Sequence, residues 1–251
     1  MEKIICRYSD KGKPIIEIYQ NLDESEIEEL TQFTFEYKVK HFVINEKVTD
    51  ITFLNLFKSN VEILIILDPD EQLNISPIEE LTNLEILRIR EFKKQKFDLS
   101  KLNKLKKLFI HWNNEMIGFS QLNFLEVIEI YNYKLSDSSL LELPASLSHL
   151  VFISSRIENL GVLNNTPCLK QFELHNCMKI KSLSGIEKCL NINEITLYSC
   201  PELVEIDDVA ELKKLKKIVL ENCKSLKSVE ALRCLPLLEE PIQLGSTKAK
   251  W

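Results

Sequence analysis

A pattern of six positions recurs along most of the chain, with apolar residues at its first, fourth and sixth positions and variable residues between them. Copies of the pattern follow one another about every 20 to 23 residues. Successive side chains of a strand point to opposite faces, so each copy predicts a short strand with its apolar residues turned into a core. The copies within residues 39–238 begin at Val39, Val61, Leu84, Leu105, Leu125, Leu147, Leu169, Ile192 and Leu215.

One copy is too short to bury its own apolar face, so neighbouring copies must stack into a continuous core. The pattern, as in Val61-Glu-Ile-Leu-Ile-Ile66, resembles that of the leucine-rich repeat family. The resemblance implies an α/β repeat solenoid, with a curved parallel sheet on its concave face and short helices or 3₁₀ turns on its convex face. Units of this length look like those of internalins and phosphatase regulators. The lysine-, isoleucine- and asparagine-rich composition suggests a bacterial source.

The chain is expected to form one continuous domain with an N-terminal cap at residues 1–36, about nine repeat units at residues 37–240 and a tail at residues 241–251. In the cap, β-rich runs at Lys3–Tyr8 and Pro14–Tyr19 flank turn-forming residues and predict a hairpin. Asp23 and Glu26 have the spacing of a capping box. They predict a helix that covers the end of the core.

A tenth copy of the pattern begins at Leu235 but contains a proline at position 241. Proline lacks the backbone donor that a ladder strand needs, so the stack is expected to stop at Glu240–Pro241. The terminal Trp251 either folds back over the last unit or lies exposed. The sequence does not decide between these two arrangements.

Cysteine occupies the ninth position of three consecutive repeats: Cys177, Cys200 and Cys223. One cysteine per coil predicts a row of stacked thiols. A zinc site that adds His175 is the alternative, but zinc ligands usually come in closely spaced pairs, and His175 should point to the opposite side of its strand. We therefore predict no metal and a buried thiol row. Cys189 and Cys234 are expected to be buried in return segments.

The third, fifth and seventh positions of each repeat should face the open, concave side of the sheet, where they are free to vary for binding. Aromatic and arginine side chains on such a face are typical anchors of protein interfaces. We predict partner contacts for Ile63, Ile65, Leu67, Arg88, Arg90, Phe109, His111, Trp112, Glu129, Tyr131, His149, Ile153, Glu173, His175 and Tyr198.

Three features of this face carry the prediction. The row Ile63, Ile65 and Leu67 is an apolar patch, unless the N-terminal cap covers it or its residues serve only strand formation. The aromatic group Phe109, His111, Trp112 and Tyr131 is expected to be adjacent in mid-stack, and alanine at Phe109 and Trp112 should abolish binding with little loss of stability. Basic residues gather toward the N-terminal half and acidic residues toward the other half.

Composition indicates the compartment and narrows the partner class. The 251 residues carry a net charge of −6 with both signs interspersed, which lacks the basic footprint of nucleic-acid binding. No secretory signal and no membrane-spanning run is apparent, and seven cysteines fit no disulfide framework, so we expect a cytoplasmic protein with reduced thiols and no membrane partner.

Signatures of catalysis are missing from the sequence, including a phosphate-binding glycine loop, a nucleophile elbow and a His-Glu-x-x-His motif. We therefore expect no enzyme activity and no cofactor. The leading hypothesis is a protein-binding module that grips a partner protein with its concave sheet and is a monomer when unbound. The alternatives are a cytosolic immunity protein that neutralises a toxin, a self-assembling scaffold that uses the Ile63 row, and a host-targeting bacterial effector.

Overall fold

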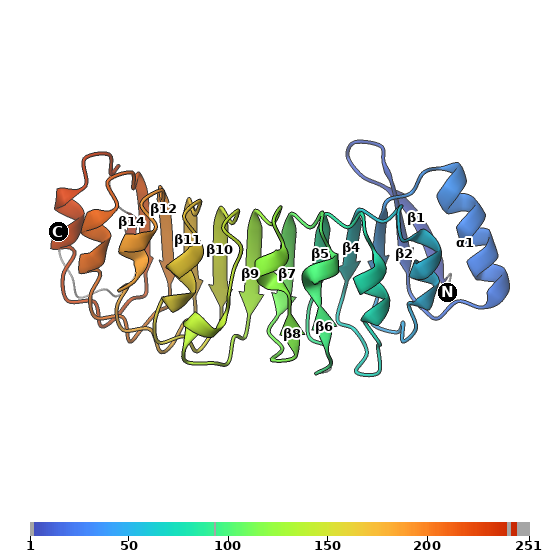
Figure 1. Ribbon diagram of the computed structural model, residues 1–251, viewed down its shortest axis with the longest axis horizontal. Coiled ribbons are helices and arrows are strands. Elements are labelled where there is room, and N and C mark those ends of the chain that lie inside the picture. Colours follow the sequence, from blue (N-terminus) through green and yellow to red (C-terminus); the bar gives the residue numbers. More distant parts are fainter. Residues whose placement is uncertain (1–2, 93, 240–241, 245–251) are drawn as a thin grey trace. The chain divides into compact units, whose positions relative to one another are not determined.

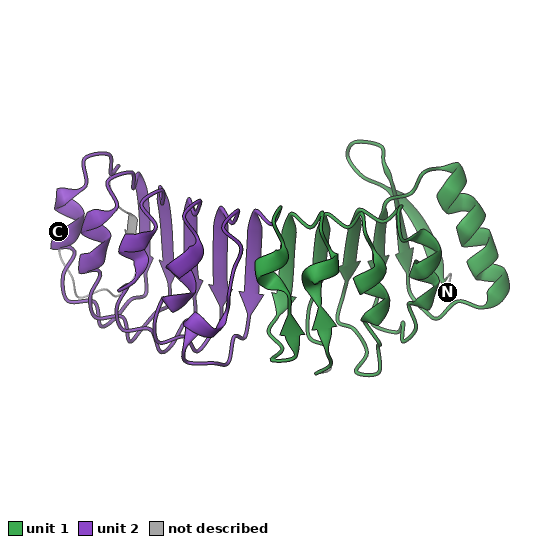
Figure 2. Ribbon diagram, in the orientation of Figure 1, with its two compact units in different colours: residues 1–124 green, residues 125–251 purple. Residues whose placement is uncertain are grey.

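The computed structural model describes residues 3–92, 94–239 and 242–244. It divides into two compact units, residues 1–124 and residues 125–251 (Figure 1, Figure 2). Each unit carries a sheet of mainly parallel strands with short 3₁₀ helices in the return segments. The leucine-rich repeat solenoid with a hairpin-helix cap, predicted from the sequence pattern, is confirmed. A single continuous domain stays a prediction.

Unit 1 begins with the cap. Strand β1 (Ile4–Tyr8) pairs antiparallel with β2 (Pro14–Ile18), and α1 (Glu24–Glu36) follows. Both bonds of the capping box form at the start of this helix. The backbone N–H of Glu26 donates to Asp23 Oδ1 over 3.0 Å, and that of Asp23 donates to Glu26 Oε2 over 2.9 Å. These bonds satisfy two amides that a helix start otherwise leaves unpaired.

The repeat strands of unit 1 run parallel to one another and join the cap through β2. Their order is β2, β3 (His41–Ile44), β4 (Ile63–Ile66), β5 (Ile86–Ile89) and β7 (Lys107–His111). The return segments form η1 (Thr52–Phe57), η2 (Ser76–Glu80), η3 (Leu99–Lys101) and η4 (Phe119–Gln121). A small parallel pair that the pattern did not predict, β6 (Phe97–Asp98) and β8 (Met116–Ile117), also lies in the returns.

Unit 2 repeats this arrangement. Its parallel strands are β9 (Val127–Tyr131), β10 (His149–Ile153), β11 (Gln171–His175), β12 (Glu194–Tyr198), β13 (Lys217–Glu221) and β14 (Ile242–Leu244). Its 3₁₀ helices are η5 (Ser138–Leu140), η6 (Gly161–Asn165), η7 (Ile186–Lys188), η8 (Asp207–Glu211) and η9 (Glu230–Cys234).

The predicted stop of the stack at Glu240–Pro241 is wrong, because β14 pairs with β13 and its register begins at Val219 with Ile242. The pairing of β14 begins at Ile242, the residue after the proline in the sequence. Trp251 lies outside the described residues.

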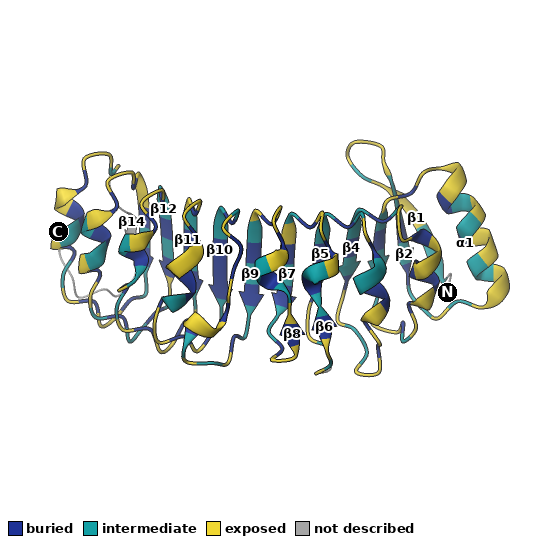
Figure 3. Cartoon of the chain, in the orientation of Figure 1, coloured by how far each residue is buried: buried dark blue, intermediate teal, exposed yellow. Residues whose placement is uncertain are grey.

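Core positions of the repeats stack in register. In unit 1, Phe42, Leu64, Leu87 and Leu108 are partners across successive strands, and all are fully buried. Each such side chain contributes roughly 1.5 to 3 kcal/mol of hydrophobic stabilisation. Exposed residues concentrate in the return segments and loops, while the strands are mostly buried or half-buried (Figure 3).

The predicted cysteine row is confirmed as buried thiols. Cys177, Cys200 and Cys223 are fully buried, and each thiol lies 3.7 or 3.8 Å from a carbonyl oxygen of the preceding repeat. The residue before each of them is left-handed, with φ of 55° at Asn176, 53° at Ser199 and 56° at Asn222, and this bends the chain out of the strand. Cys189 is buried as expected. Cys234 is exposed, so its predicted burial is wrong.

Candidate protein-interaction surface

The third, fifth and seventh positions of the repeats form one side of each sheet, which we call the open face. In unit 1 the strand registers align these residues across neighbouring strands. One aligned set contains Ile15, His41, Ile63, Ile86 and Lys107, and the next contains Glu17, Val43, Ile65, Arg88 and Phe109. The apolar patch of the open face therefore extends across neighbouring strands as well as along β4.

The Ile63 row is accessible to a partner. Ile63 and Ile65 are half-buried, and Leu67, just past the end of β4, is 38% exposed. Ile86 adds a half-buried aliphatic side chain next to Ile63. Such a contiguous apolar patch on a strand surface indicates an interaction site.

Arg88 and Phe109 make a specific pair on this face. The guanidinium carbon of Arg88 lies 4.4 Å from the centroid of the Phe109 ring, across neighbouring strands. This cation–π contact holds the arginine over the ring. Arg90, two residues further along the chain, is exposed and adds a second cation beside Arg88.

His111 is the last residue of β7 and Trp112 follows it, and their side chains lie in different environments. The His111 side chain is mostly buried, its Nδ1 lies 3.9 Å from Glu91, and burial lowers its pKa. The Trp112 ring stacks on Phe119 with centroids 6.0 Å apart, and its Nε1 donates to Asn114 Oδ1 over 2.6 Å. Trp112 therefore packs within its repeat. Its predicted grouping with Tyr131, a residue of unit 2, stays a prediction.

The open face of unit 2 is polar and has a carboxylate at its centre. The Nε2 atoms of His149 and His175 lie 2.8 Å from the two carboxylate oxygens of Glu173, one on each. Hydrogen bonds to His149 and His175 lower the pKa of Glu173 to about 2. The carboxylate is therefore ionised at neutral pH, accepts both bonds and fixes both imidazoles. Val151, between Glu129 and Glu173 in the register, is buried beneath this network.

Other predicted residues of unit 2 surround this centre. The Tyr131 hydroxyl donates to the carboxylate of Glu129. The Tyr198 ring lies beside the imidazole of His175, with centroids 6.0 Å apart, and Tyr198 is 37% exposed. Ile153 is half-buried at the end of β10, in register with Tyr131 and His175. Unit 2 thus presents fixed polar and aromatic groups, whereas unit 1 presents aliphatic side chains and arginine.

Sequence reasoning missed the basic residues that lie over the start of the apolar patch. Lys11 and Lys13 in the hairpin loop, and Lys38 and Lys40 after α1, line a cavity together with Ile63. The clustering of lysines on both sides of Gly12 is visible in the sequence, but their approach to Ile63 depends on how the hairpin pairs with β3. The cap thus borders the Ile63 row without burying it.

No group of three or more histidine, cysteine, aspartate or glutamate side chains is placed to hold a metal ion among the described residues. Within the same part of the chain, every helix is too short or too polar to cross a membrane.

No family model matches the chain, and no curated protein matches its sequence. Among solved structures it is similar to an internalin, InlF, from Listeria monocytogenes, with a TM-score of 0.59 and 18% identity over 94% of this chain and 81% of that one. The leucine-rich repeat domain of the type III effector XopL gives 0.52 and 15% identity over 94% and 77%. Toll-like receptor TLR13, in a complex with single-stranded RNA, gives 0.60 and 16% identity over 91% and 42%. These similarities show the leucine-rich repeat fold.

Proposed function

We propose that the protein is a non-catalytic binding module that holds a partner protein on the open face of its sheet. The observation that carries the proposal is the in-register apolar patch of unit 1, formed by Ile63, Ile65 and Ile86 with the Arg88–Phe109 pair at its edge. Ile63, Ile65 and Ile86 are half-buried on the side of the strands opposite the fully buried core positions.

Energetics favour a protein partner for such a surface. Burying half-exposed aliphatic side chains gains about 25 cal/mol per Å² of apolar area removed from water. An arginine already held over a ring loses little side-chain entropy when a partner contacts it. Aromatic and arginine residues at the centre of an interface are the usual binding hot spots. The apolar patch supplies the aliphatic area, and the Arg88–Phe109 pair supplies the aromatic and arginine side chains.

Electrostatics favour a protein over RNA, although the fold is shared with a receptor bound to RNA. Unit 2 carries Glu129, Glu173 and Glu194 on its open face, which repel a phosphate backbone. Glu173 is an unsuitable general base because its pKa is about 2 and both of its oxygens already accept hydrogen bonds. Binding is therefore the better proposal for this polar network as well. The unpaired thiols favour a reducing compartment, and we place the protein in the cytoplasm.

Affinity capture with matched charge variants tests the proposal. Ile65→Glu introduces a carboxylate into the centre of the patch, and Leu56→Glu introduces one into the exposed part of η1, where Leu56 is 53% exposed. We expect wild type and Leu56→Glu to capture the same protein from native lysate, and Ile65→Glu to lose it while keeping its thermal midpoint. Capture by Ile65→Glu at wild-type level would contradict the proposal. Recovery of the chain itself alone would favour self-assembly.

A further inference from the structure

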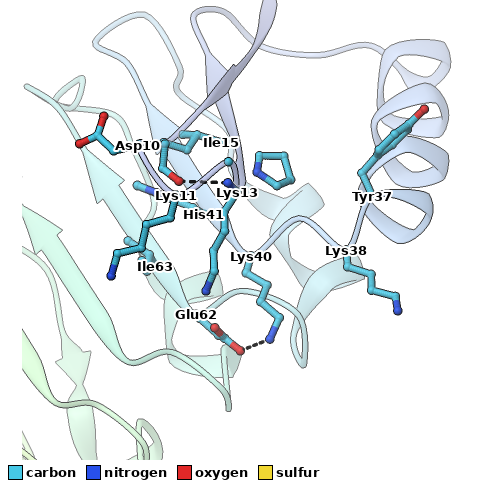
Figure 4. Close-up of a pocket in the computed structure, with 13 residues that line it drawn as sticks. Asp10, Lys11, Lys13, Ile15, Tyr37, Lys38, Lys40, His41, Glu62 and Ile63 are labelled. Atoms are coloured by element: carbon cyan, nitrogen blue, oxygen red, sulfur yellow. Dashed lines mark hydrogen bonds and ion pairs between the residues drawn. The ribbon is translucent and has the colours of Figure 1, made fainter.

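A cavity of about 580 Å³ opens in unit 1 between the hairpin loop, the residues after α1 and the first residues of β3 and β4 (Figure 4). Its volume lies in the range of ordinary ligand sites. Three residues that are partners in the sheet register, Ile15, His41 and Ile63, form one wall. The cavity therefore continues directly onto the open face at the start of the apolar patch.

The wall of the cavity is uncharged. Ile15 and Ile63 are half-buried aliphatic side chains. His41 lies between them, burial lowers its pKa, and its Nε2 is buried with no hydrogen-bond partner in the described part of the chain. A neutral imidazole flanked by two isoleucines suits an apolar or aromatic side chain.

The rim of the cavity is basic. Lys11, Lys13 and Lys38 are exposed and make no ion pair with any described residue, whereas Lys40 is paired with Glu62. In Figure 4 the side chains of Lys11 and Lys13 extend past Ile15 toward Ile63, and the carboxylate of Asp10 points away from them. The ammonium groups of Lys11 and Lys13 are therefore left without internal neutralisation at the cavity, whereas the side chain of Lys38 points away from them.

The backbone of the hairpin turn is fixed where it carries Lys11 and Lys13. The N–H of Ser9 donates to Lys13 O over 2.9 Å, and the N–H of Gly12 donates to Ser9 O over 2.8 Å. The N–H of Lys13 donates in turn to Ser9 Oγ over 3.1 Å. Gly12 has φ of 70°, a left-handed conformation that glycine adopts without strain. Because the loop is closed by these bonds, the charges of Lys11 and Lys13 are presented from a fixed turn.

We propose that this cavity binds an acidic peptide segment of the partner protein, with one apolar side chain between Ile15 and Ile63 and flanking carboxylates on Lys11 and Lys13. The inference rests on the proposed function, because the cavity opens onto the same open face. A small monocarboxylate neutralises one ammonium group, whereas a run of aspartates and glutamates neutralises both. Continuity with the apolar patch also favours a segment of a larger ligand.

Fluorescence anisotropy of the full chain with Asp-Glu-Phe-Glu-Asp-amide, which carries fluorescein on its N-terminus through an aminohexanoic acid linker, tests the inference. We expect saturable binding that weakens as ionic strength rises, because exposed charges are screened by salt. Lys11→Glu with Lys13→Glu should weaken binding by about tenfold or more. The control, Lys224→Glu with Lys227→Glu, makes the same charge change at exposed lysines of unit 2 and should leave binding unchanged.

Two further peptides separate the contributions of charge and apolar contact. Replacement of the peptide's phenylalanine by alanine should weaken binding because it removes the apolar contact with Ile15 and Ile63. Replacement of its carboxylates by amides should weaken binding because it removes the charge attraction to the lysines. The inference is overturned if no saturable binding occurs up to about 1 mM peptide. It is also overturned if both double variants lose binding equally, or if 8-anilinonaphthalene-1-sulfonate binds and the peptide does not.

Failure of this inference is distinguishable from failure of the proposed function. Suppose that the variant with Lys11→Glu and Lys13→Glu captures the native partner as wild type does, and that Ile65→Glu does not. The open face then binds the partner without the cavity, and only the inference about the cavity is contradicted. If the peptide binds and no variant changes protein capture, the cavity is a peptide site and the proposed role of the open face falls.

Discussion

The indole of Trp112 stacks on the ring of Phe119, with centroids 6.0 Å apart and ring planes 21° from parallel. The contact joins the end of β7 to the return helix η4, and Phe119 is only 4% exposed. Trp112 is thus part of the packing of its repeat, and this contact favours a loss of stability when alanine replaces it.

We predict that Trp112→Ala lowers the free energy of unfolding by about 2 kcal/mol, because it removes a half-buried ring and its stacking contact. Phe124→Ala, at a ring that is 63% exposed, should change it by less than about 0.5 kcal/mol. Urea denaturation followed by far-ultraviolet circular dichroism measures both. Equal midpoints for Trp112→Ala and wild type would show that the stack contributes nothing.

Acid should remove a stabilising contribution that Glu173 makes in unit 2. Its pKa is about 2 in the folded chain and 4.5 in the reference state, so the folded state favours the ionised carboxylate. That stabilisation is fully present above about pH 4.5 and is lost as the pH falls toward 2. We expect about 2 kcal/mol of pH-dependent stability in this window. In Glu173→Gln the unfolding free energy should fall less steeply between about pH 5 and pH 3. Parallel curves for the two proteins would contradict this assignment.

The thiols should divide into two classes in the native protein. Cys6, Cys168 and Cys234 are exposed, whereas Cys177, Cys189, Cys200 and Cys223 are buried. Burial raises the pKa of Cys177 to about 11, so its reactive thiolate is scarce at neutral pH. Ellman's reagent should therefore titrate three thiols rapidly in native protein and all seven in denaturant. Rapid native reaction of all seven would show that the buried row opens readily.

Lys38 occupies a backbone conformation that suits glycine. Its φ is 53°, directly after the end of α1, where the N–H of Val39 donates to Thr34 O over 2.9 Å. Glycine at such a helix end avoids the Cβ strain, so Lys38→Gly should stabilise the protein by about 1 kcal/mol. Lys38→Ala is the control, since it loses the charge and keeps the strain. A lower thermal midpoint for Lys38→Gly than for Lys38→Ala would contradict this account.

The repeat strands were predictable because a local pattern determines them. Apolar residues at the fourth and sixth positions, such as Leu64 and Ile66, are the ones that become fully buried. The capping box of Asp23 and Glu26 is equally local, since both of its bonds span three residues. Strand alternation alone assigns the outward positions, which is why the sequence pattern is sufficient to place Ile63 and Ile65 on the open side of β4.

Features that depend on contacts between distant segments were missed. The approach of Lys11 and Lys13 to Ile63 follows from the pairing of β2 with β3 and has no sequence periodicity. The stacking of Trp112 depends on the path of the chain through the β8–η4 return. Cys234 has an apolar neighbourhood in sequence but lies at the exposed end of η9. In each case the pattern predicts the strand and leaves the return segment undetermined.

Site-specific photo-cross-linking in native cells tests the central claim most directly. A benzophenone amino acid at position 65 lies in the apolar patch of the open face, and one at position 56 lies at an exposed site in η1. The account predicts one discrete cross-linked protein adduct from position 65 and none of that mass from position 56. Adducts from position 56 alone, or the same adduct from both positions, would contradict binding on the open face.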